Sequence, residues 1–233
     1  MYDPIIYRYI KAPRNLVARS RWQAERIKET YGQDSWVGGN WVNTGMFQPS
    51  GERSRRFLFL GKISSEKGVH LAIKYARELG VELDVVGGAI PTEIGASYQQ
   101  EMAQLCDGKQ IAFHFNVTEQ EKLGFLQHAK AVVYPVQQDE AHWLCGIETW
   151  ACNVITLTFD RGAMREILTD GKHVAGLAVP GEKSFKVAWR TFATDVPQSH
   201  INPRGVAEHL YDRRRVVDRY LEVYKKVNEG LTW

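Results

Sequence analysis

Short apolar runs alternate with helical segments along most of this chain. Two parallel strands need a long crossover between them, usually a helix, so this alternation predicts a parallel sheet with helices on both faces. The predicted fold class is therefore α/β, a doubly wound parallel sheet of the Rossmann-like kind. The expected strands are 15–19, 36–42, 56–60, 81–86, 111–115, 131–136, 154–159 and 176–179.

Capping residues mark several of the expected helices. Ser20 can cap a helix that Gly32 ends, and Thr118 with Glu121 has the spacing of a capping box. The expected helices are 21–31, 66–79, one within 90–108, 118–130, 143–152, 163–168, 185–192 and a long last helix over 205–228 with apolar Val217, Leu221 and Tyr224.

The composition is that of a globular protein with a sizeable core, because 44% of its 233 residues are hydrophobic and 24% are charged. The net charge of +3 and the isoelectric point near 8.7 suit an anionic ligand without demanding nucleic acid. Arg53, Arg55 and Arg56 lie beside an expected strand, and we interpret them as a solvated edge. No nucleic-acid partner is therefore predicted.

The three cysteines, Cys106, Cys145 and Cys152, form no CxxC pair, which favours packing roles and a reducing compartment. No apolar run approaches the roughly 20 residues that cross a bilayer, so no transmembrane segment is predicted. Residues 1–15 lack the apolar core and cleavage site of a secretory signal. We expect a soluble, cytoplasmic protein.

The stretch 131–167 concentrates the residues that could carry chemistry. Glu148 lies in a helix that is apolar on nearly every side, and an unpaired buried carboxylate is costly, so it needs a partner. A ligand hydroxyl is one candidate. Glu140 lies eight residues earlier, in the loop before that helix. Strand, loop and helix place both carboxylates at a crevice beyond the carboxyl ends of parallel strands, where open α/β sheets bind ligands.

These residues resemble a known family. Glu140 and Glu148 reproduce the E-x7-E spacing of retaining GT-B glycosyltransferases, and the segment 148–152, ETWAC, looks like their E-A-x-A-C. The segments 159–167 and 170–172 are similar to the region downstream of that motif in glycosyltransferase family 4 (group 1). The resemblance implies the C-terminal, donor-binding half of a GT-B architecture. It also implies that Glu148 accepts hydrogen bonds from ribose hydroxyls and that Glu140 contacts the transferred sugar.

A second motif, Gly61 to Gly68, reads GKISSEKG. Lys67 is expected in the first turn of a helix, where the partial positive charge of the helix N-terminus disfavours a lysine and favours an anion. The segment resembles the G-R-x4-K-G of family 4 enzymes, with Lys62 in place of the arginine. By that resemblance, Lys62 and Lys67 hold the donor's diphosphate and stabilise the leaving nucleoside diphosphate, with Gly61 beside them.

Other positions are assigned to the donor by the same resemblance. Gly87 can let the backbone approach the nucleotide, and a tight turn explains it equally well. The family usually has E-P-F-G-L where this chain has Glu140 to Leu144, so Trp143 replaces the glycine whose amide approaches the sugar and phosphate. His142 is interpreted as a surface-loop residue that could also contact the donor, and Leu144 completes the loop.

No D-x-D motif and no zinc-type spacing of cysteine and histidine occurs, so no metal and no cofactor are predicted. Lysines and helix amides would replace Mg²⁺. The expected ligand is a nucleotide-diphospho-sugar, which serves as substrate. The expected reaction is transfer of its sugar to an unknown acceptor, with retention of configuration implied by the resemblance alone.

The expected domain organisation has three parts. Residues 1–47 resemble the end of a GT-B N-terminal domain, 48–55 form a linker, and 56–233 form the nucleotide-sugar-binding domain. The acceptor side would be completed by a longer chain, a partner chain or a second copy of this chain in a homodimer. Two alternatives remain open: a non-catalytic nucleotide-sugar-binding module, and a sugar-nucleotide epimerase of GT-B architecture.

Overall fold

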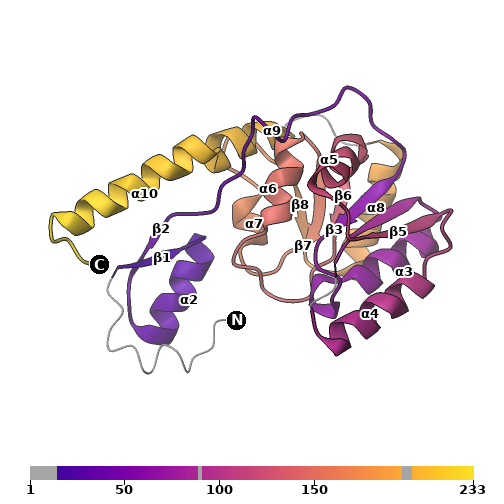
Figure 1. Ribbon diagram of the computed structural model, residues 1–233, viewed down its shortest axis with the longest axis horizontal. Helices are drawn as coiled ribbons and strands as arrows, with labels where there is room; N and C mark the ends of the chain where they lie inside the picture. The colour runs from indigo at the N-terminus through magenta and orange to yellow at the C-terminus, as the bar shows by residue number, and fades with distance from the viewer. Residues whose placement is uncertain (1–14, 89–90, 196–200) are drawn as a thin grey trace.

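A six-stranded parallel sheet forms the centre of the larger part of the molecule (Figure 1). The computed structural model describes residues 15–88, 91–195 and 201–233, so residues 1–14 and parts of the expected loops at 89–90 and 196–200 lie outside the described residues. The spatial order is β5–β4–β3–β6–β7–β8, which confirms the predicted doubly wound sheet. The strands are β3 (Phe57–Leu60), β4 (Leu83–Gly87), β5 (Ile111–Phe115), β6 (Val132–Tyr134), β7 (Thr156–Phe159) and β8 (Gly176–Val179).

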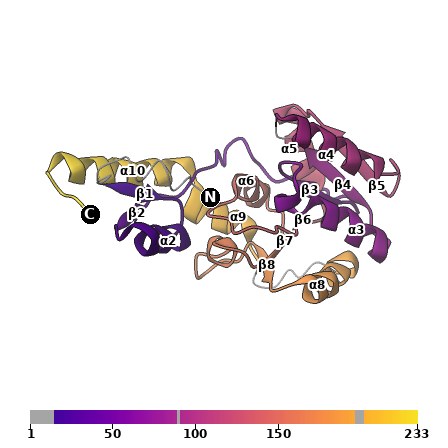
Figure 2. The same cartoon turned by 90° about the horizontal axis from the view of Figure 1, so that it is seen from below.

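Helices cover both faces of this sheet, with α3 and α8 on one side and α5 and α6 on the other (Figure 2). Every residue of β3, β6 and β7 is accordingly buried, as parallel strands between two helical layers require. The expected capping box of α5 is present. The helices are the 3₁₀ turn η1 (Ser65–Lys67), α3 (Val69–Leu79), α4 (Glu93–Gln104), α5 (Glu119–His128), α6 (Leu144–Ala151), α7 (Met164–Ile167) and α8 (Glu182–Thr194).

The direction in which the sheet grows reverses between β3 and β6. From β3 the chain adds β4 and then β5 on one side, after which β6 returns to pair with the free edge of β3, and β7 and β8 continue outward. Adjacent loops diverge at such a reversal and leave a crevice at the carboxyl ends of the strands. The loops that follow β3 and β6 are the two that the sequence analysis selected.

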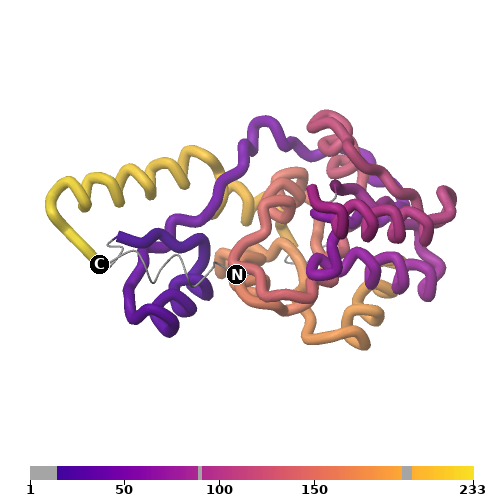
Figure 3. Tube along the Cα trace, turned by 60° about the horizontal axis from the view of Figure 1, so that its bottom comes forward, coloured from indigo at the N-terminus to yellow at the C-terminus, as the bar shows by residue number. Residues whose placement is uncertain are grey.

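A smaller unit stands beside the large sheet (Figures 1 and 3). It contains β1 (Leu16–Ala18), α2 (Arg21–Tyr31) and β2 (Ser35–Val37), with β1 and β2 paired in parallel. Ser20 caps α2 and Gly32 ends it in a left-handed conformation, as predicted. None of the helices in the described ranges is long and apolar enough to cross a membrane.

The last helix, α10 (Arg213–Asn228), packs on this smaller unit. The Tyr220 hydroxyl donates to the carbonyl of Gly39 at 3.1 Å, and the indole N–H of Trp233 donates to the carbonyl of Leu16 at 2.8 Å. The final helix, which the expected division places in the domain 56–233, thus contacts the segment that this division places in residues 1–47.

The predicted continuous helix over 205–228 is wrong, because the chain breaks it at Asp212. It forms α9 (Pro203–Val206), the π-helix η2 (Ala207–Tyr211) and then α10. The backbone of Val42 takes up the polar groups at the break: its N–H donates to Tyr211 O at 2.8 Å, and its carbonyl accepts from Arg213 N at 3.1 Å. The tertiary contact thus replaces helical hydrogen bonds that would otherwise be lost.

The apolar residues expected on the last helix do not face the molecule's interior. Val217, Leu221 and Tyr224 are 43%, 51% and 61% exposed, whereas Val216 and Val223 are buried. The buried face of α10 is therefore formed by residues one position earlier in the chain than the predicted face.

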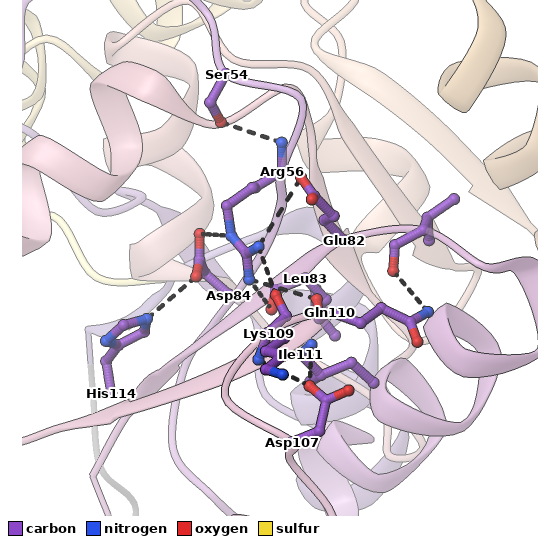
Figure 4. Close-up of polar contacts among 11 residues, drawn as sticks. Ser54, Arg56, Glu82, Leu83, Asp84, Asp107, Lys109, Gln110, Ile111 and His114 are labelled. Carbon is purple, nitrogen blue, oxygen red and sulfur yellow. Dashed lines mark hydrogen bonds and ion pairs between the residues drawn. The ribbon is translucent and has the colours of Figure 1, made fainter.

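Arg56 ties together the amino-terminal ends of three strands (Figure 4). Its Nε donates to the Asp84 carboxylate at 2.9 Å, and its Nη atoms donate to the carbonyls of Leu83 at 2.9 Å and Lys109 at 3.1 Å. The interpretation of this segment as a solvated edge is wrong for Arg56. Arg53 is exposed, as predicted, and its guanidinium donates to the carbonyls of Cys152 and Asn153 at 2.9 and 2.8 Å. A guanidinium supplies several donors at once, so one side chain can satisfy several carbonyl oxygens.

Arg56→Met is expected to lower the free energy of unfolding by roughly 2–4 kcal/mol, because it removes the cation paired with Asp84 Oδ2 and a donor to several carbonyls, leaving only His114 on the Asp84 carboxylate. Arg55→Met, at an exposed neighbouring position, should change it by less than about 0.5 kcal/mol. Urea unfolding of both variants measures the difference. Equal stability of the two would contradict the role assigned to Arg56.

Candidate functional site

The loops after β3 and β6 meet at the reversal point through an ion pair. The Lys67 ammonium contacts Oε1 of Glu140, and the same oxygen accepts a hydrogen bond from the Tyr134 hydroxyl at 2.9 Å. Glu140 is only 8% exposed. The backbone of Glu140 is also hydrogen-bonded to the segment between β7 and α7, where Ala163 N donates to Glu140 O at 2.7 Å. A carboxylate and an ammonium that are distant in sequence thus contact one another between the two loops.

Backbone contacts hold these two loops together. Gly68 has φ +77°, and a Cβ atom there would lie 1.9 Å from the carbonyl oxygen of Pro135. Two residues from this approach in each loop, Gln137 N donates to Glu66 O at 2.8 Å. Only glycine permits both the conformation and the approach.

The expected position of Lys67 in the first turn of a helix is wrong. Lys67 ends the 3₁₀ turn η1, and α3 begins two residues later at Val69, after the left-handed Gly68. The 3₁₀ turn directs Lys67 across the crevice toward Glu140. The anion at this position in the structure is therefore a carboxylate of the protein itself.

The residues at the ends of β3 and β4 pack closely. Gly61 N donates to Val86 O at 3.2 Å, and a Cβ on Gly87 would lie 1.9 Å from the carbonyl oxygen of Gly61. The close approach of the ends of β3 and β4 therefore requires glycine at position 87. The role of Gly87 toward a nucleotide stays a prediction. The side chain of Lys62 is exposed and makes no hydrogen bond or ion pair with the described residues.

Glu148 has a protein partner that sequence reasoning missed. Lys122 on α5 donates to Glu148 Oε1 at 3.0 Å and to Glu119 at 2.9 Å. Burial raises the pKa of the Glu148 carboxyl, while Lys122 acts in the opposite direction. Burial also works against the charged form of Lys122, but its hydrogen bonds to the two carboxylates outweigh this and raise its pKa.

Only part of that arrangement had a signal in the sequence. The spacing of Glu119 and Lys122 is that of a helical i,i+3 pair and could have been recognised. Their meeting with Glu148 depends on how α5 packs against α6. The ribose contact predicted for Glu148 would have to form beside this ion pair.

His142 is buried, so its interpretation as a surface-loop residue is wrong. The imidazole is 8% exposed, packs edge-on against Tyr211 with ring centroids 5.3 Å apart, and has no hydrogen-bond partner on either nitrogen. Burial, followed by the charge of Arg19, lowers its pKa to about 4. The π-helix η2 brings Tyr211 to this position from a distant part of the chain.

Trp143 is a packed residue of the crevice wall. It is 5% exposed and stacks on Tyr134 with ring centroids 4.2 Å apart. It also occupies the space over Gly146, where a Cβ would lie 2.2 Å from the indole. Leu144, in contrast, is 53% exposed. The roles predicted for Trp143 and Leu144 toward a donor stay predictions.

A family model for glycosyl transferases group 1 matches residues 46–194. The chain belongs to this family. The matched range covers more than half of the chain and contains every predicted site residue of this group 1 member, from Gly61 to Glu148. A comparison with proteins of curated function found no match.

Solved glycosyltransferase structures share the fold of this group 1 chain. AviGT4, a glycosyltransferase involved in avilamycin A biosynthesis, superposes with a TM-score of 0.72 at 21% identity, over 93% of this chain and 65% of its own. The Anabaena protein HepE, solved with UDP and glucose, gives 0.76 at 13% identity, over 91% and 63%. Sucrose-phosphate synthase from Thermosynechococcus elongatus gives 0.72 at 15% identity, over 92% and 58%.

The chain thus spans less than two thirds of the length of each of these structures. At such identities the likeness shows the fold, a Rossmann-like domain of GT-B type. It assigns no donor or acceptor to this group 1 member.

The buried His142 predicts a pH dependence of stability. In the unfolded chain a histidine takes up its proton below about pH 6.5, whereas in the fold this one does so only below about 4. The unfolded state binds more protons in that window, so stability falls as pH drops from about 6.5 to about 4, by roughly 3 kcal/mol in total.

His142→Phe should remove this component while keeping the ring that packs on Tyr211. Urea unfolding at pH 7 and pH 4.5 measures it, with the exposed His128→Gln as the control that keeps the wild-type dependence. An unchanged pH dependence in His142→Phe would contradict the neutral, buried state.

Proposed function

We propose that the chain binds a nucleotide-diphospho-sugar in the crevice between the β3 and β6 loops and acts as the donor side of a glycosyltransferase. The observation that carries this proposal is the Lys67–Glu140 pair at the reversal point of the sheet. Doubly wound sheets bind ligands at that point, and a cation beside a nearly buried carboxylate suits a ligand with a diphosphate and a sugar.

In this proposal the diphosphate exchanges with Glu140 as the partner of Lys67. Lys62, exposed on the same loop, adds a second positive charge, and the backbone at Gly61 borders the site. Glu140 is then released to contact the transferred sugar. Stabilisation of the departing diphosphate by the two lysines is the main catalytic contribution.

The nucleotide would extend toward Glu148. Ribose hydroxyls would donate to its carboxylate, with Lys122 either retained beside it or displaced. Leu144 and His142 would border this part of the donor, and Gly87 would line it through its backbone. We include in the proposal a retaining reaction that needs no metal, and membership of glycosyltransferase family 4.

The acceptor side is also a proposal. We place it with a partner chain or a second copy of this chain, packed near the smaller unit of β1, α2 and β2. The free cysteines in the described part of the chain fit the reducing interior of a cell, in agreement with the proposed cytoplasmic location.

The presence of Trp143 in this loop favours one alternative function, that of a module that binds a nucleotide sugar without transferring its sugar. Its indole stacks on Tyr134 and closes the wall beside Glu140, at the position where the related enzymes were expected to have glycine. A site narrowed there would keep the diphosphate contacts and lose access to the reacting carbon.

Calorimetric titration of the chain with UDP, GDP and ADP, without and with Mg²⁺, is the direct test. One nucleotide should bind saturably without metal. Lys67→Ala should weaken its binding by about 10- to 100-fold, since a charge-assisted hydrogen bond contributes roughly 1.5–3 kcal/mol. Lys183→Ala, an exposed lysine on α8, is the matched control and should bind as the wild type does.

Glu140→Gln distinguishes the two functions. Because it frees Lys67, the variant should bind the nucleoside diphosphate at least as tightly as the wild type. If the chain is a transferase, sugar transfer or donor hydrolysis by the wild type should be lost in Glu140→Gln. Binding without any turnover would favour the non-catalytic module. No binding of any nucleotide, or equal binding by Lys67→Ala, would contradict the proposed function itself.

A further inference from the structure

Two histidines and an aspartate meet on the side of the molecule where η2 lies. Asp170 and His173 belong to the loop between α7 and β8, and His209 lies on the π-helix η2. The Nδ1 atoms of His173 and His209 lie 2.8 and 2.6 Å from the same oxygen, Oδ2 of Asp170. All three potential ligand atoms fall within 4.8 Å of one another.

The loop itself sets the orientation of the aspartate. Oδ1 of Asp170 accepts hydrogen bonds from Lys172 N at 2.8 Å and His173 N at 2.6 Å. The hydroxyl of Thr169 closes the same turn by donating to His173 O at 2.7 Å. Only Oδ2 is therefore left to face the imidazoles, and the carboxylate needs no rearrangement to present it.

Burial gives this carboxylate a need for positive charge. The side chain of Asp170 has no exposed surface, and the two imidazoles are its only side-chain partners within the described residues. His173 is largely enclosed and His209 is half exposed, at 23% and 52% of their side chains. A buried carboxylate without a cationic partner is costly, and the exposed side of His209 leaves a path by which an ion can reach it.

We propose that Asp170, His173 and His209 form a site for a divalent transition metal such as Zn²⁺. Two imidazole nitrogens and one carboxylate oxygen are a ligand set that suits Zn²⁺, Co²⁺ or Ni²⁺, whereas Mg²⁺ and Ca²⁺ favour oxygen ligands alone. Water would supply the fourth position on the side open at His209.

Metal binding requires a small local change. Ligand atoms around a tetrahedral Zn²⁺ are about 3.3 Å apart, for bonds of about 2.0–2.1 Å. The two N–O distances would therefore lengthen by roughly half an ångström as the metal replaces the two N–H···O hydrogen bonds. His209 can make this adjustment because it lies on the partly exposed η2.

The position of this site suggests its consequence. It joins the α7–β8 loop of the large sheet to η2, the segment directly before the break at Asp212 from which α10 runs to the smaller unit. A bound metal would fasten this connection and stabilise the fold in proportion to its affinity. The donor crevice is built from other residues, so the metal site stands independently of the proposed function.

The test uses tag-free chain treated with a chelator and then dialysed. Calorimetric titration with Zn²⁺ should show one equivalent bound, Co²⁺ should give visible d–d absorption of a site with nitrogen and oxygen ligands, and Mg²⁺ should give neither. Zn²⁺ should also raise the melting temperature. His209→Ala should weaken Zn²⁺ binding at least about 100-fold and abolish the thermal shift, while its half-exposed position keeps the fold intact.

His128→Ala, which removes an exposed histidine on α5, is the matched control and should bind Zn²⁺ as the wild type does. Asp170→Asn provides a second test, since it retains the shape of the side chain and removes its charge, and it should weaken binding as well. Absence of Zn²⁺ and Co²⁺ binding to the wild type, or equal binding by wild type and His209→Ala, would overturn the proposal.

Discussion

The contact between the β3 and β6 loops is the constraint on which the candidate site depends. The sheet reverses its direction of growth there, so the loops on either side would diverge if nothing joined them. Gly68 lets the backbone of one loop touch Pro135 of the other, and Lys67 then reaches Glu140. The two loops therefore have a fixed position relative to one another in the absence of a ligand.

The two carboxylates of the candidate site are paired with protein groups. Glu140 has Lys67 and Tyr134, and Glu148 has Lys122. Such pairs roughly offset the cost of desolvation and add little net stability. In the proposed function, these pairs allow exchange of partners, because a ligand that brings its own charges and hydroxyls would replace one member of a pair without leaving the other unpaired.

The two parts of the molecule are joined by polar contacts of the backbone. Val42 occupies the break before α10, and Glu166 on α7 accepts hydrogen bonds from Arg21 N and Trp22 N, at 2.8 and 2.9 Å, at the start of α2. A carboxylate at a helix N-terminus satisfies donors that the helix leaves free and interacts favourably with its dipole. The smaller unit thus has a defined position against the large sheet.

The sequence by itself determined the α/β class and the order of the strands, because apolar periodicity and capping are local properties. The two loops of the candidate site were selected by the charges of their residues and by the family resemblance of their motifs. It also showed that Glu148 needed a partner. Only the tertiary structure decided that the partner is Lys122, that His142 is buried against Tyr211 and that the last helix breaks at Asp212. It alone brought His209 beside Asp170 and His173. These outcomes depend on contacts between segments far apart in the chain. A local sequence pattern cannot indicate which distant group will pair with a buried charge or with an unbonded backbone N–H or carbonyl group.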